Sequence, residues 1–153
     1  MPLVVGALAP DFSLQDETGT FRHLSEFHGS PVVLYFYPKD DTPGCTTEAC
    51  NFRDGYGEYQ RAGVVILGIS PDPVNSHANF KAKFDLPFTL LADHDHKVCN
   101  LYQVWGRKKF MGREYDGVFR TTFVISPAGK IIKVFENVKP EGHSQEVLAA
   151  LQE

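Results

Sequence analysis

Two cysteines five residues apart follow a loop rich in proline, aspartate and glycine, and their side chains are the most reactive in the sequence. Residues 37–50 read YPKDDTPGCTTEAC, with the thiols at Cys45 and Cys50. We expect a helix over residues 46–61, so that Cys45 lies where the helix begins. Backbone N–H groups in a first helical turn lack intrahelical partners and carry partial positive charge, which stabilises a thiolate. The pattern favours a Cys45 that reacts as an anion and is then captured by its neighbour.

Three further residues are candidates for completing a site around Cys45. Arg120 opens the apolar run at residues 121–125, and sites in open α/β sheets gather at strand ends. Thr42 lies three residues before Cys45, and its hydroxyl can contact a small oxygen-containing substrate or cap the helix. Pro38 can limit the freedom of the loop and shield the thiol, or can serve only as a turn residue.

A disulfide between Cys45 and Cys50 is incompatible with an intact helix. In a regular helix, Cα atoms five residues apart are separated by roughly 8.7 Å, whereas a disulfide needs them closer than about 7 Å. The first turns must therefore unwind, and we expect a helical reduced form and a locally unfolded oxidised form. The alternative interpretation of Cys50 is a cysteine that is simply buried in the helix.

Other side chains that resemble functional groups have simpler interpretations. Cys99 is expected to pack as a small apolar residue, with a resolving or intermolecular role as the alternative. Residues 93–96 read DHDH and resemble a metal-ligand cluster, but turn and capping chemistry explains them better. Four scattered histidines are interpreted as surface or hairpin residues: His23, His28, His77 and His143. Four aromatic residues are candidates for an apolar rim or for core packing: Phe36, Trp105, Phe110 and Phe119.

The elements that must position these residues alternate between strand and helix. Residues 11–15 and 20–24 predict a small hairpin. Apolar runs predict further strands at 31–37, 64–70, 88–92, 120–125 and 131–135. Helices are expected at 46–61, 75–84, 96–105 and 146–152, the last capped by Ser144. The order predicts one α/β domain over residues 1–153, with a mixed central sheet covered by helices on both faces.

Bulk properties restrict the class of protein. The 153 residues include 42% hydrophobic and 22% charged residues, which is ordinary for a globular domain. The net charge of −4 argues against a nucleic-acid surface, and the basic run at 106–109 is expected to be a solvated loop. We find no stretch long enough to cross a bilayer. Three cysteines, an odd number, favour a reducing cytoplasm, although a mature chain trimmed of an organelle transit peptide would look the same.

The segment around Cys45 resembles the active-site motif of the peroxiredoxins, in particular the Q subfamily, also called bacterioferritin comigratory protein. The likeness extends over nearly the whole chain, from APDF at 9–12 through GISPD at 68–72 to RTTFVI at 120–125. It implies a thioredoxin-like fold and reduction of hydrogen peroxide and organic hydroperoxides without metal or prosthetic group. By the same resemblance Cys45 is the peroxidatic cysteine and Cys50 the resolving one. Pro38, Thr42 and Arg120 complete the peroxide site.

The expected reaction cycle has two competing interpretations. In the cycle, Cys45 becomes a sulfenic acid, Cys50 converts it to an intrachain disulfide, and thioredoxin or a similar dithiol protein reduces the disulfide. Resolution within one chain needs no second subunit, so we expect a monomer. A general disulfide oxidoreductase usually has two residues between its cysteines, and here four intervene. A redox-sensing or chaperone-like protein would be oxidised once without steady turnover.

Overall fold

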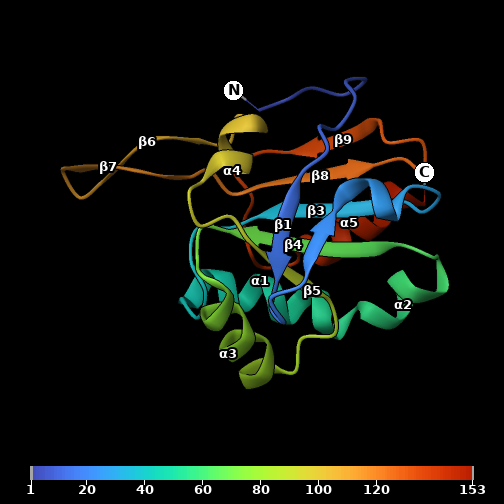
Figure 1. Ribbon diagram of the computed structural model, residues 1–153, viewed down its shortest axis with the longest axis horizontal. Helices are drawn as coiled ribbons and strands as arrows, with labels where there is room; N and C mark the ends of the chain where they lie inside the picture. Colours follow the sequence, from blue (N-terminus) through green and yellow to red (C-terminus); the bar gives the residue numbers. More distant parts are fainter. Residues whose placement is uncertain (1, 153) are drawn as a thin grey trace.

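A seven-stranded mixed sheet forms the centre of the computed structural model, which describes residues 2–152 (Figure 1). The strand order is β2-β1-β5-β4-β3-β8-β9. The strands of this sheet are β1 (Ser13–Asp16), β2 (Phe21–His23), β3 (Val32–Phe36), β4 (Val65–Ser70), β5 (Thr89–Ala92), β8 (Thr121–Ile125) and β9 (Ile131–Phe135). The three central strands β3, β4 and β5 are parallel, and an antiparallel pair lies at each edge. The predicted mixed sheet and its N-terminal hairpin are confirmed.

Helices cover both faces of the sheet, as expected. They are α1 (Pro43–Asp54), α2 (Tyr56–Arg61), α3 (Val74–Phe84), α4 (Lys97–Leu101) and α5 (His143–Leu151), with a 3₁₀ helix, η1 (Leu24–Phe27). Helices α1, α2, α3 and α5 contribute to the core on one face, and α4 and η1 to the core on the other. Strand β3 is buried throughout because Val33 and Tyr35 enter the first core while Leu34 enters the second.

The helix expected at residues 46–61 begins earlier and is interrupted. Helix α1 begins at Pro43, whose fixed φ suits a first helical position and whose missing N–H would have no helical partner there. At Gly55 the backbone leaves the helical region, and α2 begins at Tyr56. A Cβ atom at position 55 would lie 3.1 Å from the Ser144 hydroxyl, so glycine allows α1 and α5 to approach each other.

The helix expected at residues 96–105 is wrong beyond Leu101. Residues Trp105–Phe110 form β6, which pairs with β7 (Arg113–Val118) in a two-stranded hairpin that projects from the body of the molecule (Figure 1). We call this hairpin the arm. The basic run at 106–109 is therefore a strand and not a loop. Both faces of the arm are largely exposed, so the alternation of apolar and polar residues that marks a half-buried strand is missing from its sequence.

Two histidines and one helix start also differ from the sequence-based expectation. His77 and His143 are completely buried, whereas the sequence was interpreted as placing them at the surface or in a hairpin. Helix α5 begins at His143, three residues earlier than expected. Its cap is Gly142 at φ 74°, not Ser144, whose carbonyl accepts a hydrogen bond from the Tyr59 hydroxyl.

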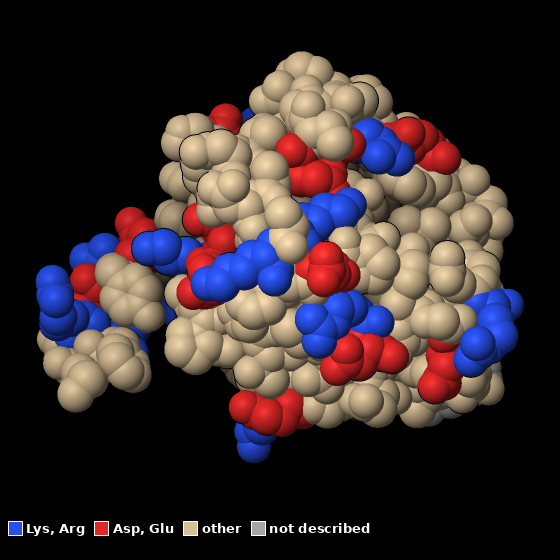
Figure 2. Space-filling view, turned by 90° about the horizontal axis from the view of Figure 1, so that it is seen from below, with Lys and Arg blue, Asp and Glu red and all other residues tan. Residues whose placement is uncertain are grey.

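Charged side chains of both signs are interspersed over the face shown in Figure 2, and the arm stands clear of the body in that view. Several large apolar residues of the arm are exposed, with Met111 at the tip 85% accessible.

Among residues 2–152, no helix combines the length and the apolar character needed to cross a membrane.

Candidate active site

The sheet brings Cys45 and Arg120 together although 75 residues separate them. Phe36 at the end of β3 pairs with Thr121 at the start of β8, so the loop after β3 and the residue before β8 lie at the same edge. Arg120 Nη2 donates to Cys45 Sγ at 3.3 Å. Cys45 is 1% exposed and is the third residue of α1. The predicted proximity of the two residues is confirmed.

Helix geometry adds further donors near this thiol. Thr46 N–H donates to the Thr42 carbonyl, which is the first hydrogen bond of the helix. The N–H groups of Gly44 and Cys45 precede that bond and have no intrahelical carbonyl to reach. Partial positive charge therefore lies next to Cys45 Sγ from the helix, in addition to the full charge of Arg120.

Glu48 is part of the same cluster, although no motif in the sequence marks it. It follows Cys45 by three residues, a spacing that places both side chains on one face of α1 and could have identified it. Arg120 Nη1 donates to Glu48 Oε1 at 2.7 Å, and Glu48 is completely buried. Burial raises the pKa of Glu48 to about 7, and the attraction of Arg120 opposes this rise. Burial also lowers the pKa of Arg120, but Glu48 and Cys45 outweigh it, so that the pKa is raised and the guanidinium keeps its charge.

Two buried polar atoms near this cluster have no partner. Within residues 2–152, Glu48 Oε2 and the Tyr35 hydroxyl are the buried side-chain oxygens that lack a hydrogen bond. Burial raises the pKa of Tyr35 well above its ordinary value, and the negative charges of Glu48 and Cys45 raise it further, so the hydroxyl stays protonated. Unpartnered buried polar groups are rare and mark places where a ligand can bind or charge can change.

Thr42 and Pro38 lie in the loop that leads from β3 to α1, and both are half-buried. The Thr42 hydroxyl donates to the Lys39 carbonyl at 2.9 Å, so its side chain does not cap α1. Because its one proton is used, the hydroxyl oxygen remains free to accept a hydrogen bond. This side chain can therefore contact a protonated oxygen of a substrate.

Gly44 and Lys108 are two more neighbours of the site that no local signal in the sequence marks. A Cβ atom at Gly44 would lie 3.2 Å from Arg120 Nη2, so glycine leaves room for the guanidinium. Lys108 of the arm donates to the Val118 carbonyl at 2.8 Å. Burial lowers the pKa of Lys108 and Arg120 lowers it further, whereas Cys45 opposes them, so this ammonium belongs to the same electrostatic environment.

All three cysteines are free thiols in the structure. Cys50 is half-buried and lies on the same continuous helix as Cys45, so the two sulfurs cannot join while α1 is intact. Cys99 is completely buried in the core on the opposite face of the sheet, which confirms its packing role. Burial raises its pKa, and Asp93 adds to the rise.

The remaining candidates take structural positions. The Asp93 carboxylate accepts the N–H groups of Val98 and Cys99, and Asp95 accepts that of Lys97, so the capping interpretation of residues 93–96 is confirmed. His96 stacks on Trp105 with ring centroids 4.0 Å apart. Of the other three aromatic candidates, Phe36 is in the core, whereas Phe110 and Phe119 are exposed.

A mixed α/β fold that holds a buried thiol in a first helical turn, beside a guanidinium, is the arrangement of a cysteine that reacts as a thiolate. Residues 5–134 match the AhpC/TSA family. The chain is 50% identical to the Coxiella burnetii putative peroxiredoxin bcp over 99% of this chain and all of that protein. It is 48% identical to the Escherichia coli K12 peroxiredoxin Bcp, over 99% and 97% of the two chains.

Solved structures agree with these relatives. A peroxiredoxin Q of Xanthomonas campestris superposes with a TM-score of 0.90 at 41% identity, over 98% of this chain and 96% of that one. A cysteine-to-serine mutant of Xylella fastidiosa PrxQ superposes with a TM-score of 0.93 at 33% identity, over 99% and 97%. This chain belongs to the AhpC/TSA family and, within it, to the peroxiredoxin Q, or bacterioferritin comigratory protein, group.

Proposed function

We propose that this chain is a thiol peroxidase that reduces hydrogen peroxide and organic hydroperoxides with Cys45 as the attacking nucleophile. The contact of 3.3 Å between Arg120 Nη2 and Cys45 Sγ carries the proposal, because it places a fixed cation on the sulfur that must react as an anion. Family membership supports it. The Xanthomonas campestris bacterioferritin comigratory protein has trapped intermediate/ligand complex structures that concern alkyl peroxide reduction.

In the first step, the Cys45 thiolate attacks the terminal oxygen of the hydroperoxide in line with the O–O bond. A bond forms between sulfur and that oxygen, and the electron pair of the O–O bond moves to the departing oxygen, which takes a proton and leaves as water or an alcohol. Arg120 and the N–H groups of the first turn stabilise the charge that develops. Thr42 accepts a hydrogen bond from the peroxide, and Pro38 keeps the loop around the thiol closed to water.

In the second step, the Cys50 thiol attacks the sulfenic acid on Cys45, a disulfide forms and water leaves. The first turns of α1 unwind so that the two Cα atoms can approach. Thioredoxin or a similar dithiol protein then reduces the disulfide by thiol exchange. All of these groups lie in one chain, which supports a monomer without added cofactor. An odd number of cysteines, three, supports a reducing compartment such as the cytoplasm.

Peptide mapping by mass spectrometry after one equivalent of peroxide tests the assignment of the two cysteines. We expect a link between Cys45 and Cys50, and a Cys50→Ser variant should instead accumulate oxidised Cys45 without the link. A link through Cys99, or overoxidation of the wild-type protein without any link, would displace the proposed cycle. Steady turnover of peroxide with thioredoxin present distinguishes an enzyme from a sensor, which would be oxidised once and stop.

Amide hydrogen exchange across residues 43–54 tests whether the first turns of α1 unfold when the disulfide forms. The reduced protein should protect these amides, because α1 is an intact helix there. The oxidised protein should exchange them faster over the first turns. Equal protection in the two forms would contradict local unfolding.

A further inference from the structure

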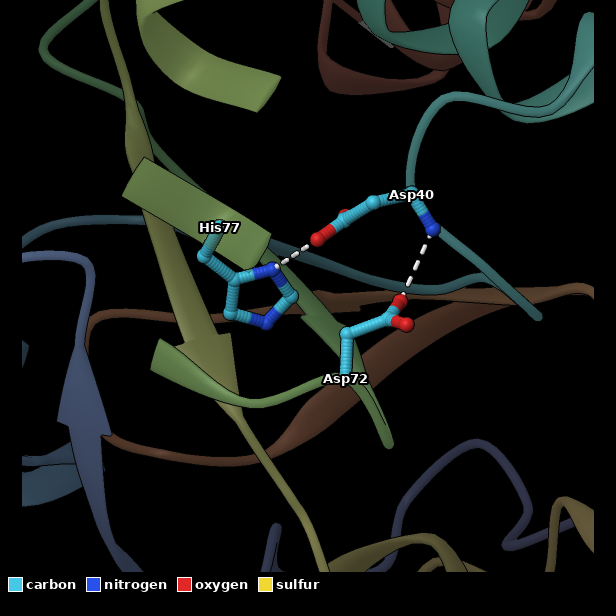
Figure 3. Close-up of side chains that lie close together, drawn as sticks. All are labelled: Asp40, Asp72 and His77. Atoms are coloured by element: carbon cyan, nitrogen blue, oxygen red, sulfur yellow. Dashed lines mark hydrogen bonds and ion pairs between the residues drawn. The ribbon is translucent and has the colours of Figure 1, made fainter. Parts of the chain in front are cut away.

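A buried cluster of polar side chains centred on Asp40 holds the loop that leads to Cys45. Asp40 lies between β3 and α1 and is 6% exposed. Its carboxylate accepts hydrogen bonds from the Tyr37 hydroxyl at 2.5 Å and from the Ser76 hydroxyl at 2.8 Å. His77 Nδ1 lies 2.7 Å from Asp40 Oδ2, as Figure 3 shows. The last two partners belong to α3, so this cluster joins the loop to a helix.

His77 is oriented by its second ring nitrogen. Nε2 lies 2.9 Å from the Leu91 carbonyl of β5, and since a carbonyl only accepts, Nε2 carries a proton. One further proton lies between Nδ1 and the Asp40 carboxylate. Whichever atom holds that proton, the Asp40–His77 pair has no net charge and both of its groups are satisfied, which makes burial tolerable.

The main chain of the loop is held at the same residue. Asp40 N–H donates to Asp72 Oδ2 at 2.8 Å (Figure 3), and the same oxygen accepts the Ser70 hydroxyl at 2.7 Å. The side chains of Asp40, Asp72 and His77 lie close enough together to suggest a metal site. Their hydrogen bonds with one another and with neighbouring groups already explain the arrangement.

Asp41, the residue that follows Asp40, is exposed and only weakly held. Asp41 has a left-handed backbone at φ 56°, and its carboxylate pairs with Lys83 at the surface, where both side chains are about half exposed. Exposed ion pairs of this kind contribute little to stability. Asp40 is therefore the last residue before α1 with a buried side chain, five residues before Cys45.

We propose that Asp40 and His77 are positioning residues that form a latch, closed while α1 is intact and opened when its first turns unwind to let Cys45 meet Cys50. The inference rests on the proposed function, because it concerns the step in which the disulfide forms. When Cys45 approaches Cys50, the loop at residues 37–42 and the first turn of α1 must move with it. The hydrogen bonds of Asp40 resist that movement, so their strength sets the fraction of molecules in the unwound form.

The latch predicts opposite sensitivities for the two chemical steps. Attack on peroxide uses the helical form, which is the major one, whereas disulfide formation uses the minor unwound form. A substitution that shifts the equilibrium constant between the two forms tenfold toward the unwound form raises the minor population about tenfold. It leaves the major population almost unchanged. Disulfide formation should therefore accelerate while the reaction of Cys45 with peroxide keeps its rate. A general loss of stability would not separate the two steps in this way.

The test compares Asp40→Ala, Asp40→Asn and Asp41→Asn in rapid-quench experiments, with a reagent that traps sulfenic acid and mass spectrometry as the readout. We expect Asp40→Ala to form the disulfide about tenfold faster and to consume peroxide within twofold of the wild-type rate. Asp40→Asn should be intermediate, because its amide can donate to Nδ1 of neutral His77 and its oxygen can accept from Tyr37. Asp41→Asn, the matched control in the same loop, should leave both rates within twofold.

The second readout is overoxidation of Cys45, which competes with disulfide formation for the sulfenic acid. Faster disulfide formation leaves less time for a second peroxide to attack the sulfenic acid, so Asp40→Ala should yield less sulfinic acid at high peroxide. An unchanged disulfide rate in folded Asp40→Asn and Asp40→Ala, or an equal loss in both steps, would overturn the latch. If Asp40→Ala does not fold, Asp40→Asn decides alone. A wild-type protein that forms no Cys45–Cys50 disulfide would instead remove the proposed function.

Discussion

The buried polar cluster around Asp40, in the loop between β3 and α1, and the cluster around Cys45, in the first turn of α1, differ in how completely their hydrogen bonds are satisfied. Around Asp40, both carboxylate oxygens and both nitrogens of His77 have partners. Around Cys45, the thiol has a single side-chain donor, and Glu48 Oε2 and the Tyr35 hydroxyl have none within the described chain. The first cluster resists change, whereas the second has unused capacity to accept a hydrogen bond or a proton.

This difference separates a structural role from a reactive one among residues of similar burial. A satisfied network in a low-dielectric interior rigidifies the backbone that carries it. An unsatisfied one costs stability and is retained where a substrate completes it. The segment from residue 40 to residue 45 is therefore fixed at Asp40, and at Cys45 the proposed chemistry requires the groups to exchange partners. Four substitutions probe the reactive side of this comparison, in decreasing order of their expected effect.

Removing the sulfur should have the largest effect. A Cys45→Ser variant should consume hydroperoxide at least about 10³-fold more slowly, because a serine hydroxyl is neither ionised nor nucleophilic enough near neutrality. The initial rate of peroxide loss with a dithiol reductant measures this. A Cys99→Ala variant is the control, since Cys99 is buried on the opposite face of the sheet. Undiminished peroxide removal by Cys45→Ser would refute the role of the sulfur.

Removing the guanidinium should have the next largest effect. An Arg120→Met variant should react with peroxide on the order of 10²-fold more slowly, the size of effect seen when one donor to a developing negative charge is lost. It also leaves Glu48 buried without its ion-pair partner. Stopped-flow measurement of the bimolecular rate tests this. Arg113→Met, on the exposed arm, is the control and should react normally. A loss smaller than about fivefold in Arg120→Met would place the essential charge elsewhere.

The raised pKa of Glu48 makes stability depend on pH. Since the folded pKa of about 7 exceeds the ordinary 4.5, the folded state binds the proton more tightly than the unfolded state. The contribution of Glu48 to the free energy of unfolding therefore falls by about 3 kcal/mol as the pH rises from about 4.5 to 7. Above pH 7 this contribution is constant. Glu48→Gln removes this dependence, so its stability relative to wild type should rise between pH 5 and pH 8.

Urea unfolding of both proteins at several pH values measures that relative stability. Glu58→Gln changes an exposed carboxylate on α2 and should track the wild-type curve at every pH. A constant difference between Glu48→Gln and wild type from pH 5 to pH 8 would mean that the Glu48 carboxyl is ionised throughout this range.

The smallest effect on the rate with peroxide is expected when one methyl group is added at Gly44. A Gly44→Ala variant places a Cβ atom 3.2 Å from Arg120 Nη2, whose position Glu48 and Cys45 fix. The rate with peroxide should fall severalfold, while the helix gains up to about 1 kcal/mol from the better helix former. Gly57→Ala in α2 is the matched control, because its Cβ would meet only Arg61 at 3.6 Å. It should share the gain in thermal stability without the loss of rate. Equal rates for both variants would show that Arg120 has room to move.

The sequence predicted the mixed α/β architecture, the strands of the central sheet close to their observed limits, and a cysteine in the first turn of a helix. These predictions succeeded because they depend on local signals: apolar runs for buried strands, and a Pro-Asp-Gly loop before a thiol in a first helical turn. The predictions that were wrong involved segments without such a signal. The exposed arm lacks alternation, and the early start of α1 depends on a proline that read as part of the loop.

The partners of Cys45 depended on contacts between distant segments. Arg120 could be proposed because it opens a strand, but the pairing of Phe36 with Thr121 places it. The burial of His77 and its contact with Asp40 join residues 37 apart in sequence, and a histidine flanked by a serine and an alanine gives no local sign of this. The residue types and their spacing were enough to propose the Cys45 thiol as the nucleophile, because nucleophilicity belongs to the side chain. Which charges surround that sulfur followed from the fold, because electrostatic interactions depend on distance in space and not on separation along the chain.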